Sequence, residues 1–131
     1  AGTAEHVVWP NCEIADKGSD VLEADHSGSL GCIKIVAVRE KSQGRGVGTQ
    51  LIKHCERQLR KLGATVVIVP TWRKPDGVIN IGGVLHHSGY EVWRECQLFW
   101  QKDCDSSNFE CPVRGADASC QCDMVIFKRI L

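Results

Sequence analysis

The feature that most constrains the fold is a central segment that reads as strand, helix and strand in succession. Residues 30–38 are rich in β-branched side chains with partial alternation, which indicates a strand. Apolar residues then recur at three- and four-residue steps over residues 47–62, as in an amphipathic helix that Gly63 stops. The apolar run at residues 65–69 fits a strand covered on both faces that ends at Pro70. This order predicts a βαβ unit with a right-handed crossover.

The predicted helix has one apolar face and one charged face. The apolar positions, which we expect to pack against a sheet, are Val47, Leu51, Cys55, Leu59 and Leu62. The charged positions, which we expect to face away from it, are Lys53, Glu56, Arg57, Arg60 and Lys61.

Gly44, Gly46 and Gly48 occupy the junction between the first strand and the helix. Without Cβ atoms, the backbone can turn sharply there and a ligand can approach it closely. The free N–H groups of the first helical turn, together with the helix dipole, favour phosphate oxygens. The alternating spacing excludes the dinucleotide-binding G-x-G-x-x-G motif, and no Lys-Ser/Thr pair follows as in a P-loop. The junction therefore predicts a phosphate-binding turn, and a turn without any ligand is the alternative.

The remaining elements are expected on both sides of this unit. Three short strands should precede it, at residues 6–9, 12–15 and 21–24. After it we expect a helix capped by Asp76 that runs to about Ser88, a strand at residues 91–101 and a final strand at residues 124–131.

Composition limits the kind of protein. A chain of 131 residues has the size of one domain, which we place at residues 1–131. The 16 basic and 16 acidic side chains balance, so neither nucleic acid nor an anionic membrane is an expected partner. No apolar run approaches the roughly 20 residues of a spanning helix, and the first residues do not resemble an export signal. We therefore expect a soluble cytoplasmic domain.

The glycine turn resembles that of a known family. Gln43, Gly46 and Gly48 match the pattern Gln/Arg-x-x-Gly-x-Gly/Ala, which is similar to the pyrophosphate turn of the GNAT (Gcn5-related N-acetyltransferase) family. The order of elements from about Leu30 to Leu131 follows that family too. The resemblance implies an α/β (α+β) fold, in which a mixed, mostly antiparallel twisted sheet contains the βαβ unit. The N-terminal helical region is shortened here.

The resemblance also implies a function, the transfer of an acetyl group from acetyl-CoA to an amine acceptor. The CoA pyrophosphate would bind to the turn formed by Gln43, Gly44, Arg45, Gly46, Val47 and Gly48. The pantetheine arm would pair with the preceding strand end, at Val36, Ala37 and Val38. Two alternatives stay open: a domain that binds acyl-CoA without turnover, and an interaction domain stabilised by zinc.

The catalytic groups depart from the family pattern. Leu85 stands where many members have a tyrosine that protonates the CoA thiolate. His86 and His87 follow it, and either imidazole could donate a proton near neutral pH. A purely structural role for both histidines is the alternative. The strand at residues 30–38 offers no carboxylate as a base, and Glu23 and Asp25 are substitutes only in principle.

The eight cysteines fall into two groups. The first group is scattered among apolar neighbours, as buried free thiols are, and comprises Cys12, Cys32, Cys55 and Cys96. The second group crowds into a polar insertion at about residues 103–122, where we expect one structural zinc ion bound by Cys104, Cys111, Cys120 and Cys122. Free surface thiols and a disulfide pair are the alternatives.

The shortened N-terminal region has a consequence for assembly. A sheet without its usual covering helices would expose apolar strand surface, which soluble monomers rarely tolerate. We therefore expect a homodimer.

Overall fold

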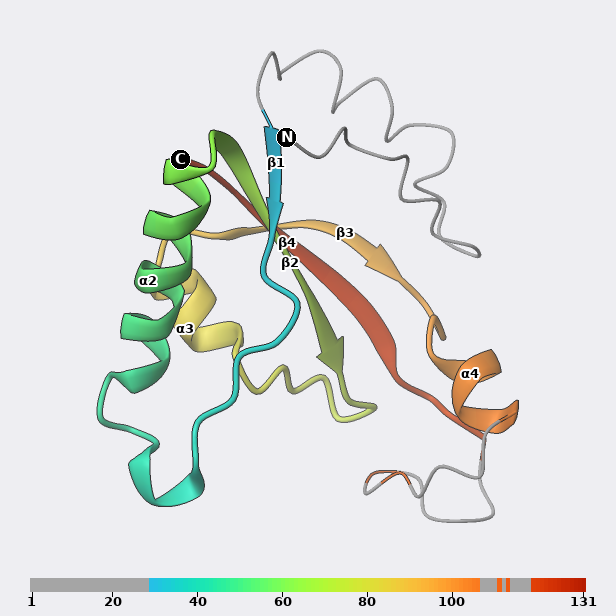
Figure 1. Ribbon diagram of the computed structural model, residues 1–131. Helices are drawn as coiled ribbons and strands as arrows, with labels where there is room; N and C mark the ends of the chain where they lie inside the picture. The colour runs from blue at the N-terminus through green and yellow to red at the C-terminus, as the bar shows by residue number, and fades with distance from the viewer. Residues whose placement is uncertain (1–28, 107–110, 112, 114–118) are drawn as a thin grey trace.

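The computed structural model describes residues 29–106, 111, 113 and 119–131 (Figure 1). The strands expected at residues 6–9, 12–15 and 21–24 lie outside this part. The described strands are β1 (Ser29–Cys32), β2 (Ala64–Arg73), β3 (Glu91–Cys96) and β4 (Asp123–Ile130). The helices are the 3₁₀ helix η2 (Glu40–Ser42) and the α-helices α2 (Val47–Lys61), α3 (Gly82–His87) and α4 (Gln101–Ser106). No helix in the described residues is both long enough and apolar enough to cross a membrane.

The four strands form one mixed sheet in the order β1-β2-β4-β3. Strand β1 pairs with β2 in parallel, and α2 connects them, so the predicted βαβ unit is confirmed. Strand β4 runs antiparallel to both of its neighbours, β2 and β3. The expectation of a mixed, mostly antiparallel sheet around a βαβ unit is confirmed as well.

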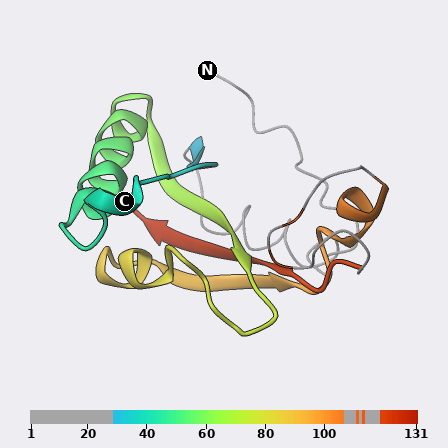
Figure 2. The ribbon, with the colours of Figure 1, turned by 90° about the horizontal axis from the view of Figure 1, so that it is seen from below.

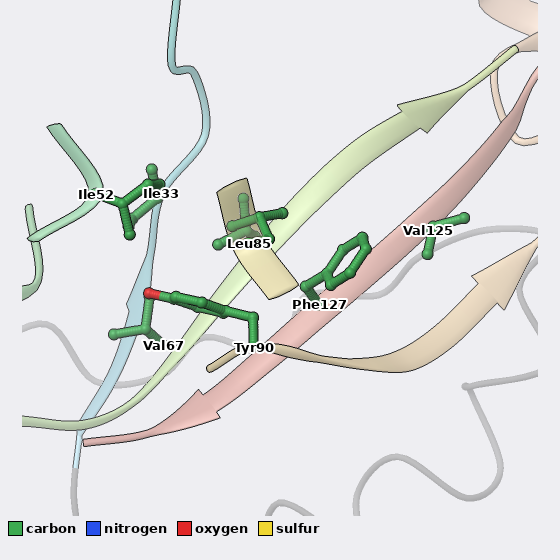
Figure 3. Packing of buried hydrophobic residues seen from close by; sticks show 8 residues of the cluster. Ile33, Ile52, Val67, Leu85, Tyr90, Val125 and Phe127 are labelled. Atoms are coloured by element: carbon green, nitrogen blue, oxygen red, sulfur yellow. The ribbon is translucent and has the colours of Figure 1, made fainter. Parts of the chain in front are cut away.

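Apolar side chains pack on both faces of this sheet. One face is covered by α2 and α3, which lie beside each other (Figure 2). Its core, drawn in Figure 3, consists of Ile33, Ile52, Val67, Val69, Leu85, Tyr90, Val125 and Phe127. The opposite face has a smaller core of Ile68, Cys96, Met124 and Ile126, and against it pack Leu30, Trp93, Phe99 and Trp100.

The two parallel strands differ in length from the prediction. The first strand ends at Cys32, although residues 30–38 were expected to be extended throughout; Ile33 adds a last hydrogen bond, from its N–H to the Ile68 carbonyl (3.0 Å). The second strand does not end at Pro70 but continues to Arg73. The Ile68 carbonyl points toward β1, where it accepts the hydrogen bond from Ile33. Backbone groups two residues apart point to the same side of a strand, so the Pro70 nitrogen also points toward the β1 side. Because β1 has already ended there, no ladder needs the missing proline N–H.

The predicted helix that starts at Asp76 is also shorter, since only Gly82–His87 is helical. Asp76 instead closes a turn, because its Oδ1 accepts a hydrogen bond from the Val78 N–H at 2.9 Å. This bond lowers the pKa of Asp76, and nearby Lys74 adds to the effect. The strand expected at residues 91–101 stops at Cys96, and the chain turns into α4; the final strand is confirmed.

The buried face of α2 is rotated from the predicted one. Ile52 and Glu56 are its buried residues, whereas Leu51 and Leu62 are exposed. Glu56 was expected in solvent but is only 3% exposed, and its Oε1 lies 2.8 Å from Nη1 of Arg129 on β4. An ion pair to the sheet is what allows a carboxylate on the inner face of the helix.

The first group of cysteines also differs from the expectation of buried free thiols. Cys32 is exposed, Cys55 is half-buried and free, and Cys96 is disulfide-bonded. Cys12 lies outside the described residues.

Candidate functional site

A glycine turn joins η2 to α2 and leaves backbone donors available at the start of the helix. Gly44 and Gly46 have φ angles of 69° and 78°, in the left-handed region that favours glycine. Gly46 caps the helix without any side-chain hydrogen bond to it. The first backbone bond of the helix runs from the Gln50 N–H to the Gly46 carbonyl (3.1 Å). The preceding amides of the first turn are therefore free to bind a ligand.

The side chain of Gln43 closes the base of this turn. Its Nε2 donates a hydrogen bond to the Val38 carbonyl at 3.0 Å, which ties the turn to the segment that follows β1. A Cβ added at Gly44 or Gly46 would meet no atom within 4 Å, so the space in front of the turn is open. The sequence therefore builds a turn whose backbone faces solvent rather than protein.

A pocket of about 1050 Å³ lies in front of the turn. Its walls come from the segment after β1, the turn, the first turns of α2 and the α3 region. The cofactor residues predicted from the sequence all line it except Arg45, whose side chain is exposed. The predicted residues that the structure brings to this pocket are Val36, Ala37, Val38, Gln43, Gly44, Gly46, Val47 and Gly48.

Other residues of this pocket were missed by sequence reasoning. They are Ser42, Thr49, Lys53, Asn80, Ile81, Gly83, Val84 and His87; His87 was singled out as a candidate acid, and Lys53 only as a charged position of the helix. Asn80 and Ile81 precede α3 in the chain, and no spacing signal in the sequence connects them with the turn. Gly48 brings the two helices together, because a Cβ there would lie 3.4 Å from Cγ2 of Val84.

The segment after β1 offers an unpaired backbone edge to this pocket. Beyond Ile33, no backbone hydrogen bond joins residues 34–38 to β2 in the described part of the chain. Figure 1 shows the chain turning away from β2 after β1. Unpaired N–H and C=O groups of an extended segment can pair with a second extended chain or with the amides of a ligand.

The structure separates the two candidate catalytic histidines. His86 packs edge-on against the buried ring of Phe127, with ring centroids 5.4 Å apart and an interplanar angle of 78°. His87 instead lines the pocket, and its Nδ1 lies 3.2 Å from the Gly83 carbonyl. Donation of the Nδ1 proton to this carbonyl would leave Nε2 for other partners. Only His87 of the pair is thus placed beside the turn's pocket.

Leu85 and Tyr90 are both core residues. Leu85 is 0% exposed, so the position of the family's tyrosine is filled by a packing residue here. Tyr90 is the chain's only tyrosine and is 1% exposed. Burial raises the pKa of Tyr90, and the neighbouring Glu56 carboxylate raises it further. Tyr90 therefore stays neutral inside the core.

Three of the four cysteines in the predicted zinc cluster are buried. Cys111, Cys120 and Cys122 belong to the interior, and Cys104 is half-buried. Burial raises the pKa of the Cys122 thiol, a hydrogen bond with Trp72 opposes this, and Cys120 adds to the increase. In the described residues, no three His, Cys, Asp or Glu side chains are grouped to hold a metal ion. The four-cysteine zinc site thus finds no support from this geometry.

Comparisons with solved structures show the same fold. An acetyltransferase from Elizabethkingia anophelis with acetyl-CoA bound is 18% identical, with a TM-score of 0.56 and coverage of 100% of this chain and 94% of that one. An acetyltransferase from Bacillus subtilis in complex with CoA is 19% identical, with a TM-score of 0.56 and coverage of 100% and 95%.

Two further structures are longer than this chain. The chain spans only 62% of an IAA acetyltransferase from Bacillus cereus, which is 20% identical with a TM-score of 0.55 and matches 76% of this chain. It spans 42% of a mosquito arylalkylamine N-acetyltransferase like 5b, which is 16% identical with a TM-score of 0.51 and also matches 76% of this chain.

Sequence comparison assigns the family. Searching the curated proteins gave no match. The family model described as Acetyltransferase (GNAT) family matches residues 7–76, which is more than half of the sequence. The chain therefore belongs to the GNAT acetyltransferase family.

Proposed function

We propose that this protein is an acyl-CoA-dependent N-acetyltransferase that transfers an acetyl group from acetyl-CoA to an amine. The observation that carries the proposal is the turn at residues 43–48, which opens its free amides onto the 1050 Å³ pocket. A pyrophosphate bound there would accept hydrogen bonds from the first turn of α2 and interact favourably with the helix dipole.

The remaining parts of the pocket suit the rest of the cofactor. The pantetheine arm carries amide groups, and the backbone at Val36, Ala37 and Val38, where only the Val38 carbonyl is engaged by Gln43, offers them hydrogen-bonding partners. Lys53 lies one and a half turns into α2 and places a cation in the pocket, beside the proposed phosphate position. We infer that the thioester lies beyond Val36, at the end of the pocket away from the turn.

The reaction would be direct attack of a neutral amine on the thioester carbonyl. The new C–N bond forms, the C–S bond breaks, and the CoA thiolate takes up a proton while the amine nitrogen loses one. We propose that His87, in its imidazolium form, donates the thiolate proton from Nε2, because Nδ1 faces the Gly83 carbonyl and the side chain lines the same pocket. Alignment of the amine and the thioester would supply much of the rate.

Calorimetry on a matched pair of variants tests the cofactor site. Gly46→Glu puts a bulky carboxylate where the pyrophosphate would bind, and we expect at least a hundredfold loss of acetyl-CoA affinity. Gly63→Glu is the control, because Gly63 has a similar φ of 88° at the other end of α2 and also faces open space. Equal acetyl-CoA affinity in the two variants would contradict the assignment.

A turnover assay separates the enzyme from the second candidate, a domain that binds acyl-CoA without reacting. Release of free CoA thiol from acetyl-CoA, measured with a panel of amines, is the expected result for the enzyme. Cofactor binding without any release would favour the binding domain, to which the core position of Leu85 gives some weight.

Zinc binding, homodimer formation and a cytoplasmic location stay predictions from the sequence. Native mass spectrometry of the zinc-supplemented protein tests the first two together, with Cys111→Ser as the variant that should lose a bound ion.

A further inference from the structure

A second cavity, of about 300 Å³, continues the cofactor pocket beyond Val36. The two cavities share three lining residues, Val36, Asn80 and Ile81. If the function proposed above is correct, this cavity lies where the thioester ends and the acceptor amine must arrive. The inference below rests on that function and concerns the class of the acceptor.

The cavity exists because β1 ends before β2 does. Backbone pairing between them stops at Ile33, whereas β2 continues to Arg73, so a gap opens along the edge of β2. Val69 belongs to the core beneath α2 and α3, and alternation along the strand places Thr71 on the same face. Pro70 and Trp72 alternate to the opposite face. Since all four β2 residues line the cavity, it reaches from one face of the sheet to the other.

Aromatic and aliphatic side chains form most of the cavity wall. Trp72 is 36% exposed and comes from β2, while Trp100 comes from the segment just before α4. Trp100 is held in place by the ring of Phe99, with centroids 4.8 Å apart. The aliphatic wall residues are Ile33, Ile35, Val36, Val69, Ile79 and Ile81.

Polar side chains among the described wall residues are few, namely Lys34, Thr71 and Asn80. The Thr71 hydroxyl donates to the Val125 carbonyl at 2.6 Å, so its proton is occupied. Among the described residues that line the cavity, Lys34 is the one charged side chain, and it is exposed. A cation at this position repels a second positive charge on a ligand, and it favours the neutral form of an amine held nearby.

We propose that this cavity binds the body of the acceptor, and that the acceptor is a primary amine carried on an aromatic ring without a second cationic group. An aromatic ring gains both apolar burial and ring contacts with Trp72 and Trp100. The volume is at the lower end for small-molecule sites and suits one or two rings. Diamines and polyamines are poor acceptors because Lys34 opposes their second charge.

Steady-state kinetics with two probe amines test the proposal. For the wild type we expect kcat/KM for phenethylamine to exceed that for 1,5-diaminopentane by about tenfold or more. Trp72→Leu should lower kcat/KM for phenethylamine by about tenfold, mainly through KM, and leave the diamine unchanged. Lys34→Glu should raise kcat/KM for the diamine severalfold.

Trp93→Leu is the matched control, because Trp93 packs against the same face of the sheet without lining the cavity. It should leave the preference between the two amines unchanged, and circular dichroism verifies the fold of each variant. Equal use of the two amines by the wild type, or equal effects of Trp72→Leu and Trp93→Leu, would overturn the proposal.

Binding measurements separate failure of this inference from failure of the proposed function. Acetyl-CoA binding is measured by calorimetry, and amine binding to the CoA-loaded protein by tryptophan fluorescence. Cofactor binding without preferential binding of phenethylamine overturns only the acceptor class. Absence of cofactor binding overturns the proposed function and this inference with it.

Discussion

The two edges of β2 differ sharply in how far they are paired. On one side, β4 pairs with β2 from Val66 to Arg73 in an unbroken antiparallel register. On the other side, β1 pairs with it only through Cys32, and the backbone bonds end at Ile33. The long ladder places its side chains in the two cores, whereas the end of the short one leaves the cavity of about 300 Å³ along the edge of β2.

The two edges of β2 therefore have different roles: the edge paired with β4 contributes to stability, and the edge left by β1 contributes to ligand binding. A fully paired edge satisfies the backbone and buries apolar side chains on both faces. An edge whose partner has ended leaves room and free backbone groups for a ligand. We therefore expect substitutions on the β4 side to change the free energy of unfolding, and those on the open side to change ligand affinity or turnover.

The largest expected effect lies on the paired side, in the ion pair between Glu56 and Arg129. Arg129→Met leaves a carboxylate with 5% side-chain exposure without its partner. We expect about 3 kcal/mol of lost stability, measured by urea denaturation, because an unpaired buried charge is costly. Acetyl-CoA affinity should stay near that of the wild type.

The double variant Glu56→Met/Arg129→Met is the control for this prediction. Since it removes both charges, it should recover most of the lost stability. A loss below about 1 kcal/mol in the single variant would show that the pair acts like an exposed one.

The next effect concerns the cofactor pocket, at the two adjacent histidines of α3. His87→Gln should lower kcat about a hundredfold, as expected for loss of a general acid, without changing acetyl-CoA affinity. His86→Gln is the matched control, since His86 packs on Phe127 and does not line the pocket. Equal kcat values for the two variants would remove His87 from the mechanism.

A smaller effect should follow from loosening the turn. Gln43→Ala removes the hydrogen bond to the Val38 carbonyl, so the turn must be ordered when the cofactor binds. We expect acetyl-CoA to bind about fivefold more weakly, which corresponds to about 1 kcal/mol for one hydrogen bond. Gln50→Ala, on the exposed surface of α2, is the control and should bind acetyl-CoA as the wild type does. Similar calorimetric affinities for the two variants would show that the Gln43 hydrogen bond is not needed for cofactor binding.

The smallest effect is expected at Lys53, the lysine in the cofactor pocket. Lys53→Ala should weaken acetyl-CoA binding about threefold at low salt, because an exposed ion pair contributes less than about 1 kcal/mol. The difference from the wild type should vanish at high salt, where the charges are screened. Lys61→Ala in the last turn of α2 is the control, and a loss independent of salt would argue against a phosphate contact.

Features set by local chain chemistry could be predicted from the sequence. The turn at residues 43–48 needs glycines at positive φ, and its neighbours need a strand pattern and a helix pattern. All of these are visible in consecutive residues, so the βαβ unit and the position of the turn agreed with the structure. The family model matches residues 7–76, which include the predicted βαβ unit and the turn.

Features that depend on how elements pack could not be predicted in this way. Of the apolar face predicted for α2, Cys55 and Leu59 do pack against the core, but Leu51 and Leu62 are exposed. The structure buries Ile52 and Glu56 instead. The periodicity of a helix defines a stripe only to within about one residue, and contact with the sheet selects the orientation. The Glu56 carboxylate can be buried because it forms an ion pair with Arg129, which is distant in the sequence.

The sequence alone thus determined the order of the central elements and the backbone conformation of the turn, because both follow from neighbouring residues. The tertiary structure decided where β1 stops pairing, which of two adjacent histidines reaches the pocket, and that Trp72 and Trp100 share one cavity. These depend on contacts between segments far apart in the chain. No pattern within one segment encodes them, because the direction of each side chain is fixed by its partners across the fold.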